Sequence, residues 1–245
     1  GPEVLQRVEV DSRKIVTGLN HMGALPVKLV PKAVLTTPEA VKQLCLEANA
    51  APNCIGLVTW MHTFSPAKMW IAGLTSLKQP YAHLHTQFGR DIPWSSIDMD
   101  YMNLHQSAHG GREFGFMCSR LRQNRKVIAG HWEDPAVQRR LGTWMRAAAA
   151  WHDSQSTRIA RIGDNMREVA VTEGDKVAAQ IQFGYSVNGY GVGELVEYVD
   201  AVLDGEIQRL CAEYEQEYAL AEPLRAGGDQ RSALVEAARI ELGLR

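Results

Sequence analysis

A nearly continuous apolar segment at residues 54–60, CIGLVTW, most constrains what this chain can fold into. A strand without alternating polar residues is typical of a parallel sheet that is covered on both faces. Strand patterns follow at residues 81–85, 126–132 and 157–163, and a shorter one precedes at residues 27–30. Helical patterns lie between them, so the sequence predicts parallel βαβ units with right-handed crossovers.

Helix-start signals support this alternation. Thr37 precedes Pro38 and Ser65 precedes Pro66, which places a capping side chain directly before a proline at the first helical position. Asp134 is the expected cap of a long helix. Further helices are expected at residues 2–19, 112–124 and 232–245.

The fold class that follows is α/β. We expect a doubly wound parallel sheet, Rossmann- or flavodoxin-like, over residues 1–157, followed by the beginning of a second α/β domain over residues 158–245. The boundary lies where the regular alternation gives way to GDNMREVAVTEGDK and a glycine-rich NGYGVGE. The chain opens GPEV and its last helical pattern stops at Arg245, so we expect a segment of a longer protein.

Composition argues against several classes of partner. A net charge of −2 does not favour binding to nucleic acid or to a charged membrane surface. The sequence contains neither a signal peptide nor an apolar run of about 18 residues, which a membrane span needs. Its four cysteines are scattered without a CxxC pair, as expected of reduced thiols in a cytoplasmic protein.

Polar and aromatic residues cluster where the predicted strands end. MHTFSP follows the first long strand, TQFGRDIPW the next, and DNMRE the last. In open parallel sheets, ligands bind outside the carboxyl ends of the strands. These residue types suit a small polar ligand held between apolar walls, although each single residue, His62 among them, is more often structural.

Two histidine pairs have spacings that a metal site could use. His105 and His109 lie in NLHQSAHGGREFGF, one helical turn apart, and His83 and His85 share one face of a strand. Neither pair has a third ligand at supporting spacing, and the two glycines after His109 interrupt the turn. We therefore favour structural roles for both pairs. Walker, dinucleotide-binding and GxSxG motifs are also missing, so no nucleotide cofactor is predicted.

Several long strings together resemble the L-arabinose isomerase family. They are LVTWMHTFSPAKMWIAGL, HLHTQFGRDIPWSSIDMDYMNL, QSAHGGREFGF, GHWEDP and RIGDNMREVAVTEGDKVAAQIQFGYSVN. The resemblance covers nearly the whole chain. It assigns residues 1–157 to the family's N-terminal Rossmann-like domain and residues 158–245 to the start of its central domain. It also implies that the family's first strand and its C-terminal half are missing here.

The resemblance implies a role in arabinose catabolism. Members interconvert L-arabinose and L-ribulose, and many also interconvert D-galactose and D-tagatose. They use a divalent ion, usually Mn²⁺, held by two glutamates and two histidines, and move a proton between C1 and C2 of the open-chain sugar. All four ligands belong to the part that this chain lacks, so no metal ligand is assigned here and the chain alone is expected to be inactive.

What carries over from the family is a substrate-side wall, which one subunit presents to its neighbour in a homohexamer or homotetramer. Phe64 and Met166 match positions that shape the pocket, and Gln106 and His109 match positions that hydrogen-bond sugar hydroxyls. Members commonly have NLNQ where this chain has NLHQ, so His105 replaces an asparagine and lies outside the family pattern.

Two other hypotheses stay open. The chain could be a non-catalytic, flavodoxin-like sugar-binding or regulatory module, which would bind sugar without metal. It could also be a metalloprotein that uses His83, His85, His105 or His109, which metal analysis would test.

Overall fold

A computed structural model describes residues 1–64 and 66–245 and divides them into two compact units, Gly1–Asp153 and Ser154–Arg245. The helical cap expected at Ser65 lies outside the described residues. Helices alternate with parallel strands in both units, which confirms the predicted α/β class. Among the described residues, no helix combines the length and apolar character needed to cross a bilayer.

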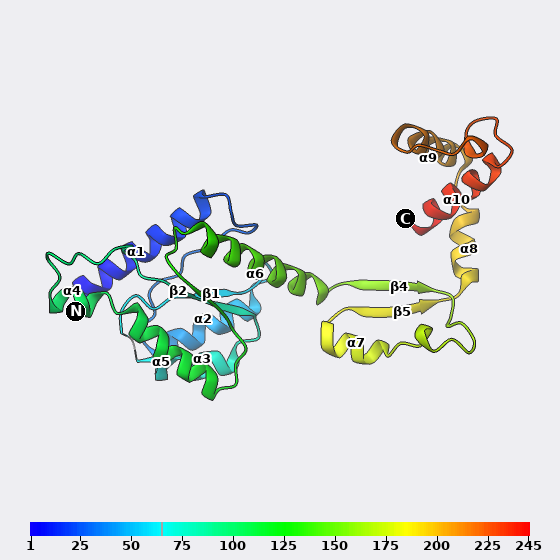
Figure 1. Cartoon of the computed structure of the whole chain (residues 1–245). Coiled ribbons are helices and arrows are strands. Elements are labelled where there is room, and N and C mark those ends of the chain that lie inside the picture. Colours follow the sequence, from blue (N-terminus) through cyan, green and yellow to red (C-terminus); the bar gives the residue numbers. More distant parts are fainter. Residues whose placement is uncertain (65) are drawn as a thin grey trace. The chain divides into compact units, whose positions relative to one another are not determined.

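The first unit is built around a parallel sheet with the order β1-β2-β3. β1 is Leu57–Thr59, β2 is Tyr81–His85 and β3 is Lys126–Ala129, and each lies within a predicted strand. In this register Thr59 lies opposite His83, which in turn lies opposite Val127. The carboxyl ends of the three strands therefore meet at one edge of the sheet (Figure 1).

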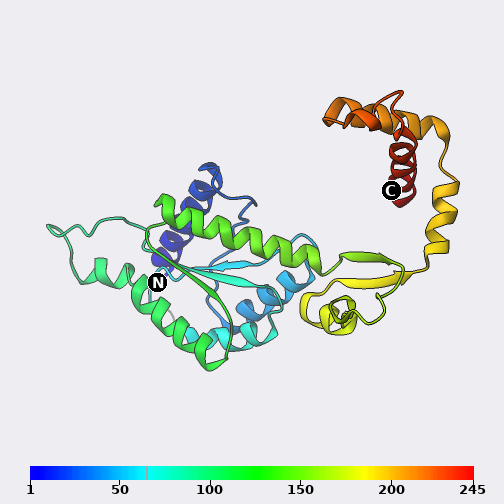
Figure 2. The ribbon, with the colours of Figure 1, turned by 45° about the vertical axis from the view of Figure 1, so that its right-hand side comes forward.

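Helices cover both faces of this sheet (Figures 1 and 2). The helices on one face are α1 (Pro2–His21) and α6 (Pro135–Ser154). The other face carries α2 (Pro38–Ala50), the 3₁₀ turn η1 (Ala67–Trp70), α3 (Ile71–Ser76) and α5 (Ser107–Arg120), which a short helix α4 (Met99–Leu104) precedes. Ala82 and Leu84 of β2 pack under α1 and α6, whereas Tyr81 packs with Phe114 of α5. The sheet is therefore doubly wound, as predicted.

Two of the predicted helix caps are formed. The Thr37 hydroxyl accepts a hydrogen bond from the Ala40 amide at 3.2 Å, with Pro38 at the first helical position of α2. The Asp134 carboxylate accepts from the Ala136 amide at 2.8 Å at the start of α6. Each side chain satisfies an amide that has no partner inside its helix.

The strand expected at residues 27–30 is not formed. The backbone of Leu29 instead hydrogen-bonds to the side chain of Asn20 on α1. The Asn20 Oδ1 accepts from the Leu29 amide and its Nδ2 donates to the Leu29 carbonyl, each at 2.9 Å. A strand needs a neighbouring strand to satisfy its backbone, and within the described residues β1 pairs with β2 alone.

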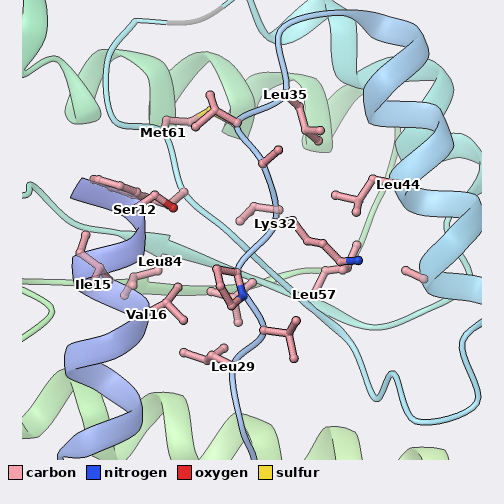
Figure 3. Close-up of a pocket in the computed structure, with 18 of the residues that line it drawn as sticks. Ser12, Ile15, Val16, Leu29, Lys32, Leu35, Leu44, Leu57, Met61 and Leu84 are labelled. Carbon is pink, nitrogen blue, oxygen red and sulfur yellow. The ribbon is translucent and has the colours of Figure 1, made fainter. Parts of the chain in front are cut away.

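A groove of about 1270 Å³ lies between residues 27–36 and β1. Figure 3 shows Ile15 and Val16 of α1 on one side of it and Leu44 of α2 on the other. Along a strand, the amide and carbonyl of one residue point to one side and those of the next residue point to the other side. The amide and carbonyl of Val58 therefore face the groove rather than β2. The groove therefore combines aliphatic walls with one open strand edge.

The second unit contains a two-stranded parallel sheet followed by a helical segment. β4 (Arg158–Ile162) pairs with β5 (Ser186–Tyr190), and the 3₁₀ turn η2 (Ala170–Thr172) and α7 (Lys176–Phe183) connect them. The later elements are α8 (Val192–Asp200), α9 (Asp204–Glu217), the 3₁₀ turn η3 (Glu222–Leu224) and α10 (Arg231–Leu244). Ile207, Leu210 and Ala238 form the buried core between α9 and α10.

The stability of the chain is expected to decrease on acidification because of His83. Burial, then the nearby His85 and Arg125, lower the pKa of His83 from 6.5 to about 4. Between these two values the unfolded chain binds a proton at this imidazole that the folded chain does not, so unfolding becomes easier as the pH falls. The contribution is at most about 1.4 kcal/mol per pH unit. Urea unfolding at several pH values between 4.5 and 7 measures how the free energy of unfolding changes with pH. This change should be smaller for His83→Gln than for the wild type, and an equal change would contradict this explanation.

Removing the Asn20 amide should destabilise the first unit. Asn20→Ala leaves the Leu29 amide and carbonyl without these two partners. We expect the free energy of unfolding to fall by about 1–2 kcal/mol, with an unchanged denaturant slope. Asn53→Ala, at an exposed turn, is the matched control and should stay close to the wild type.

Candidate functional site

The loop after β1 and the first turn of α5 form an exposed corner at the carboxyl edge of the sheet. Phe64, on the loop, is 46% exposed, and His109, on α5, is also exposed. Their rings contact each other with centroids 4.6 Å apart and planes tilted by 34°. Two of the predicted sugar-facing residues, from distant parts of the chain, are thus side by side.

Gln106 lies directly before α5 and completes this corner. Its carbonyl accepts hydrogen bonds from the amides of His109 at 3.1 Å and Gly110 at 3.0 Å, so it belongs to the same helical turn as His109. Gln106 is half-buried as a residue, and its side-chain amide donates an exposed hydrogen bond to the Asn103 side chain at 3.3 Å. The fourth predicted residue, Met166, belongs to the second unit, where it follows β4 and is 63% exposed.

A glycine pair sets how closely α5 approaches the sheet. The sequence predicts Gly110 and Gly111 as a turn before a helix that begins near Arg112, but α5 begins at Ser107 and includes both glycines. A Cβ atom at Gly110 would lie 2.5 Å from the Thr63 carbonyl oxygen, and one at Gly111 would lie 2.3 Å from the His85 ring. The pair therefore serves close packing rather than chain reversal, and this prediction was wrong.

His62 connects the loop of Phe64 to the elements around it. The imidazole is 4% exposed, with Nε2 lying 2.9 Å from the buried Asp11 carboxylate and Nδ1 lying 3.1 Å from the Leu104 carbonyl. Its own carbonyl accepts from the Ser107 hydroxyl at 3.0 Å. These contacts agree with the structural role favoured for His62, and they link α1, β1 and the junction between α4 and α5.

Asp11 is a residue that the sequence reasoning missed. It is fully buried on α1, in the same stripe as Ile15 and Leu19. A carboxylate within an apolar stripe at helical spacing was the available signal, since buried charges need a partner. The identity of that partner, His62, depends on tertiary contacts that no local pattern contains.

The two histidine pairs are the sequence's candidates for a metal site. His105 faces Tyr101, with ring centroids 4.3 Å apart, and not His109, and burial followed by the charge of His62 lowers its pKa. His83 Nδ1 lies 3.0 Å from the buried Thr59 hydroxyl. Among residues 1–64 and 66–245, no group of three His, Cys, Asp or Glu side chains is placed to hold a metal ion.

Beside the corner, a cavity of about 270 Å³ lies at the carboxyl ends of β2 and β3. Its lining includes His85, Gln87, Arg90 and His131, together with Ser107 and Ala108 of the first turn of α5. In the part of the chain that the structure describes, the buried side-chain nitrogen of Gln87 has no hydrogen-bond partner. The cavity therefore offers a few hydrogen-bonding groups within a largely apolar wall, which suits a small polar molecule.

Comparison with known proteins identifies the family. Family models of the L-arabinose isomerase N-terminal domain and central domain match residues 1–156 and residues 158–245. Relatives named L-arabinose isomerase from Herpetosiphon aurantiacus, Koribacter versatilis and Flavobacterium johnsoniae are 63%, 60% and 57% identical to this chain. These matches cover 100% of the chain but 49% of each relative, so the chain spans about half their length. The chain therefore belongs to the L-arabinose isomerase family.

Proposed function

We propose that the full-length protein containing these residues interconverts L-arabinose and L-ribulose, and also D-galactose and D-tagatose. The observation that carries the proposal is the contact between Phe64 and His109 beside Gln106. These are the positions that the family resemblance assigns to the sugar, and they come from separate elements of a chain whose relatives are named L-arabinose isomerase. The cavity next to them adds the Gln87 side-chain amide as a further hydrogen-bond donor.

In this proposal the chain supplies the substrate-side wall of the active site. The His109 imidazole and the Gln106 amide hydrogen-bond sugar hydroxyls, and the exposed face of Phe64 packs against the carbon side of the sugar. For Met166, on the second unit, an apolar contact with the sugar is what the family resemblance implies. Such groups orient the open-chain sugar, and polar partners left unpaired by a wrong sugar oppose its binding.

We assign the proposed Mn²⁺ to ligands outside this chain. The His, Cys, Asp and Glu side chains of the described residues do not come together in a set that fits the ion. The residues of this chain would accordingly bind and orient the sugar, while the metal chemistry would depend on the remainder of the polypeptide.

We also propose that the protein is a cytoplasmic homo-oligomer, a homohexamer or a homotetramer, in which the wall faces a neighbouring subunit's metal site. Large apolar side chains are exposed on the second unit, where Val171, Val177 and Ile181 are 92%, 69% and 81% exposed. Exposed apolar side chains of this size favour contact with further protein surface, from another subunit or from the remainder of the polypeptide. The four cysteines are free, in keeping with a reducing compartment.

A second candidate function is a non-catalytic sugar-binding or regulatory module. It is favoured by the fact that Phe64, Gln106 and His109 come together within one compact unit. Calorimetry with L-arabinose or ribitol in a chelator distinguishes the two candidates. Metal-independent sugar binding by the 245-residue chain would favour the module, and the catalytic proposal expects little or none.

The 245-residue chain alone is expected to form no ketose. With L-arabinose and Mn²⁺ present, a cysteine–carbazole assay should stay at background, because the described residues lack a metal site. The full-length relative from Herpetosiphon aurantiacus serves as the positive control. Ketose formation by the short chain would refute the assignment of the ligands to another part of the protein.

Truncating His109 should weaken the use of the sugar by the full-length protein. We expect His109→Ala to lower kcat/KM for L-arabinose by about 10- to 100-fold, since it removes both a hydrogen-bonding group and the partner of the Phe64 ring. His21→Ala, at an exposed position of α1, is the matched control. Equal kinetics for both variants would exclude His109 from the wall.

A further inference from the structure

Beneath the sugar-facing wall lies a buried ionic network that the proposed function does not explain. Asp11 is fully buried and His62 is 4% exposed, and their side chains lie 2.9 Å apart. Arg7 Nε donates to the same carboxylate oxygen at 3.1 Å from the surface side of α1. His105 lies against the His62 ring, with centroids 5.7 Å apart.

Two fixed contacts orient the His62 ring. Nε2 lies 2.9 Å from the Asp11 carboxylate, and Nδ1 lies 3.1 Å from the Leu104 carbonyl oxygen. Because the two nitrogen atoms lie on different sides of the ring, contacts at both of them leave the ring one orientation. The buried ring therefore joins α1 to the end of α4.

Both partners of His62 beyond Asp11 belong to one short piece of chain. Leu104 ends α4 and Ser107 begins α5, and they flank the residues His105 and Gln106. The His62 Nδ1 lies 3.1 Å from the Leu104 carbonyl oxygen, and the His62 carbonyl accepts a hydrogen bond from the Ser107 hydroxyl at 3.0 Å. The same residue stands two positions before Phe64, so it connects the loop side of the wall to its helix side.

We propose that the Asp11–His62 pair is a positioning device that fixes the α4–α5 junction and thereby the placement of Gln106 and His109 against Phe64. This inference rests on the proposed function, in which those three residues face the sugar. Neither Asp11 nor His62 touches the sugar. They act through the junction, whose geometry decides whether the two polar groups of the wall meet the hydroxyls.

Asp11→Asn tests the inference in the full-length protein. The variant keeps the volume of the side chain but replaces the carboxylate that faces His62 and Arg7 with an amide. We expect kcat/KM for L-arabinose to fall about 10- to 100-fold, mainly through KM, because a displacement of about 1 Å at positioning groups has effects of this order. Arg13→Gln is the matched control, since it breaks the exposed Glu9–Arg13 pair on the same helix, and it should leave the kinetics within about twofold.

A combined variant separates positioning from general destabilisation. If Asp11 acts through Gln106 and His109, adding Asp11→Asn to a variant that already carries Gln106→Ala and His109→Ala should lower kcat/KM little further. Losses that multiply would overturn the inference.

His62→Gln covers the case in which Asp11→Asn does not fold. Its single amide nitrogen can reach Asp11 or the Leu104 carbonyl but not both, so an intermediate rise in KM is expected, and an unchanged KM would count against the device.

Amide hydrogen exchange tests the geometry without any activity. In the 245-residue chain, the amides of His109 and Gly110 donate to the Gln106 carbonyl and should exchange faster in Asp11→Asn than in Arg13→Gln. Unchanged exchange would refute the positioning role even if the enzyme is active. A wild-type full-length protein that forms no ketose would refute the proposed function instead, whatever the exchange shows.

Discussion

The first unit depends on the burial of β2 on both of its faces. Tyr81 points into the cluster that contains Phe114 and Cys118, while Ala82 and Leu84 point into the cluster that contains α1 and α6. Because side chains alternate along a strand, the five residues of β2 pack against the helical layers on both faces of the sheet. The same strand ends at His85, and the absence of a side chain at Gly111 allows α5 to pack against the His85 ring. The position of the candidate site is thus a consequence of how this one strand is covered.

The sequence predicted those parts of the fold whose signals are local. β2 was predicted at its observed bounds, and Thr37 was identified as the cap of α2, since apolar runs and capping residues depend on short-range chemistry. Residues 27–30 have an equally apolar pattern, but a strand also requires a neighbouring backbone, and the Asn20 side chain takes that place at Leu29. The start of α5 was misplaced because glycines usually interrupt a helix, whereas here packing against Thr63 and His85 outweighs their low propensity.

The sugar-facing residues could be predicted only through the family resemblance, and the buried pair of Asp11 and His62 could not be predicted at all. Phe64 and His109 are distant in the chain, and no spacing rule joins them, yet their rings are in contact. Spacing alone would have paired His105 with His109, but His105 turns toward Tyr101 and His62. Asp11 is an acidic residue within an apolar stripe, which indicates that it has a buried partner. The pattern does not identify this partner, because the choice depends on how α1 packs against the end of β1.

The orientation of the His62 ring explains why a polar pair occurs where apolar side chains would hold the layers together equally well. Removing polar and charged groups from water is costly, and well-packed apolar side chains of similar volume often give equal or greater stability. Apolar contacts, however, are not directional, and they leave a backbone junction free to shift by small distances. The His62 ring has two nitrogen atoms at a fixed angle, one directed at Asp11 and the other at the Leu104 carbonyl. A wall that must present Gln106 and His109 to sugar hydroxyls needs that angular constraint more than it needs additional stability.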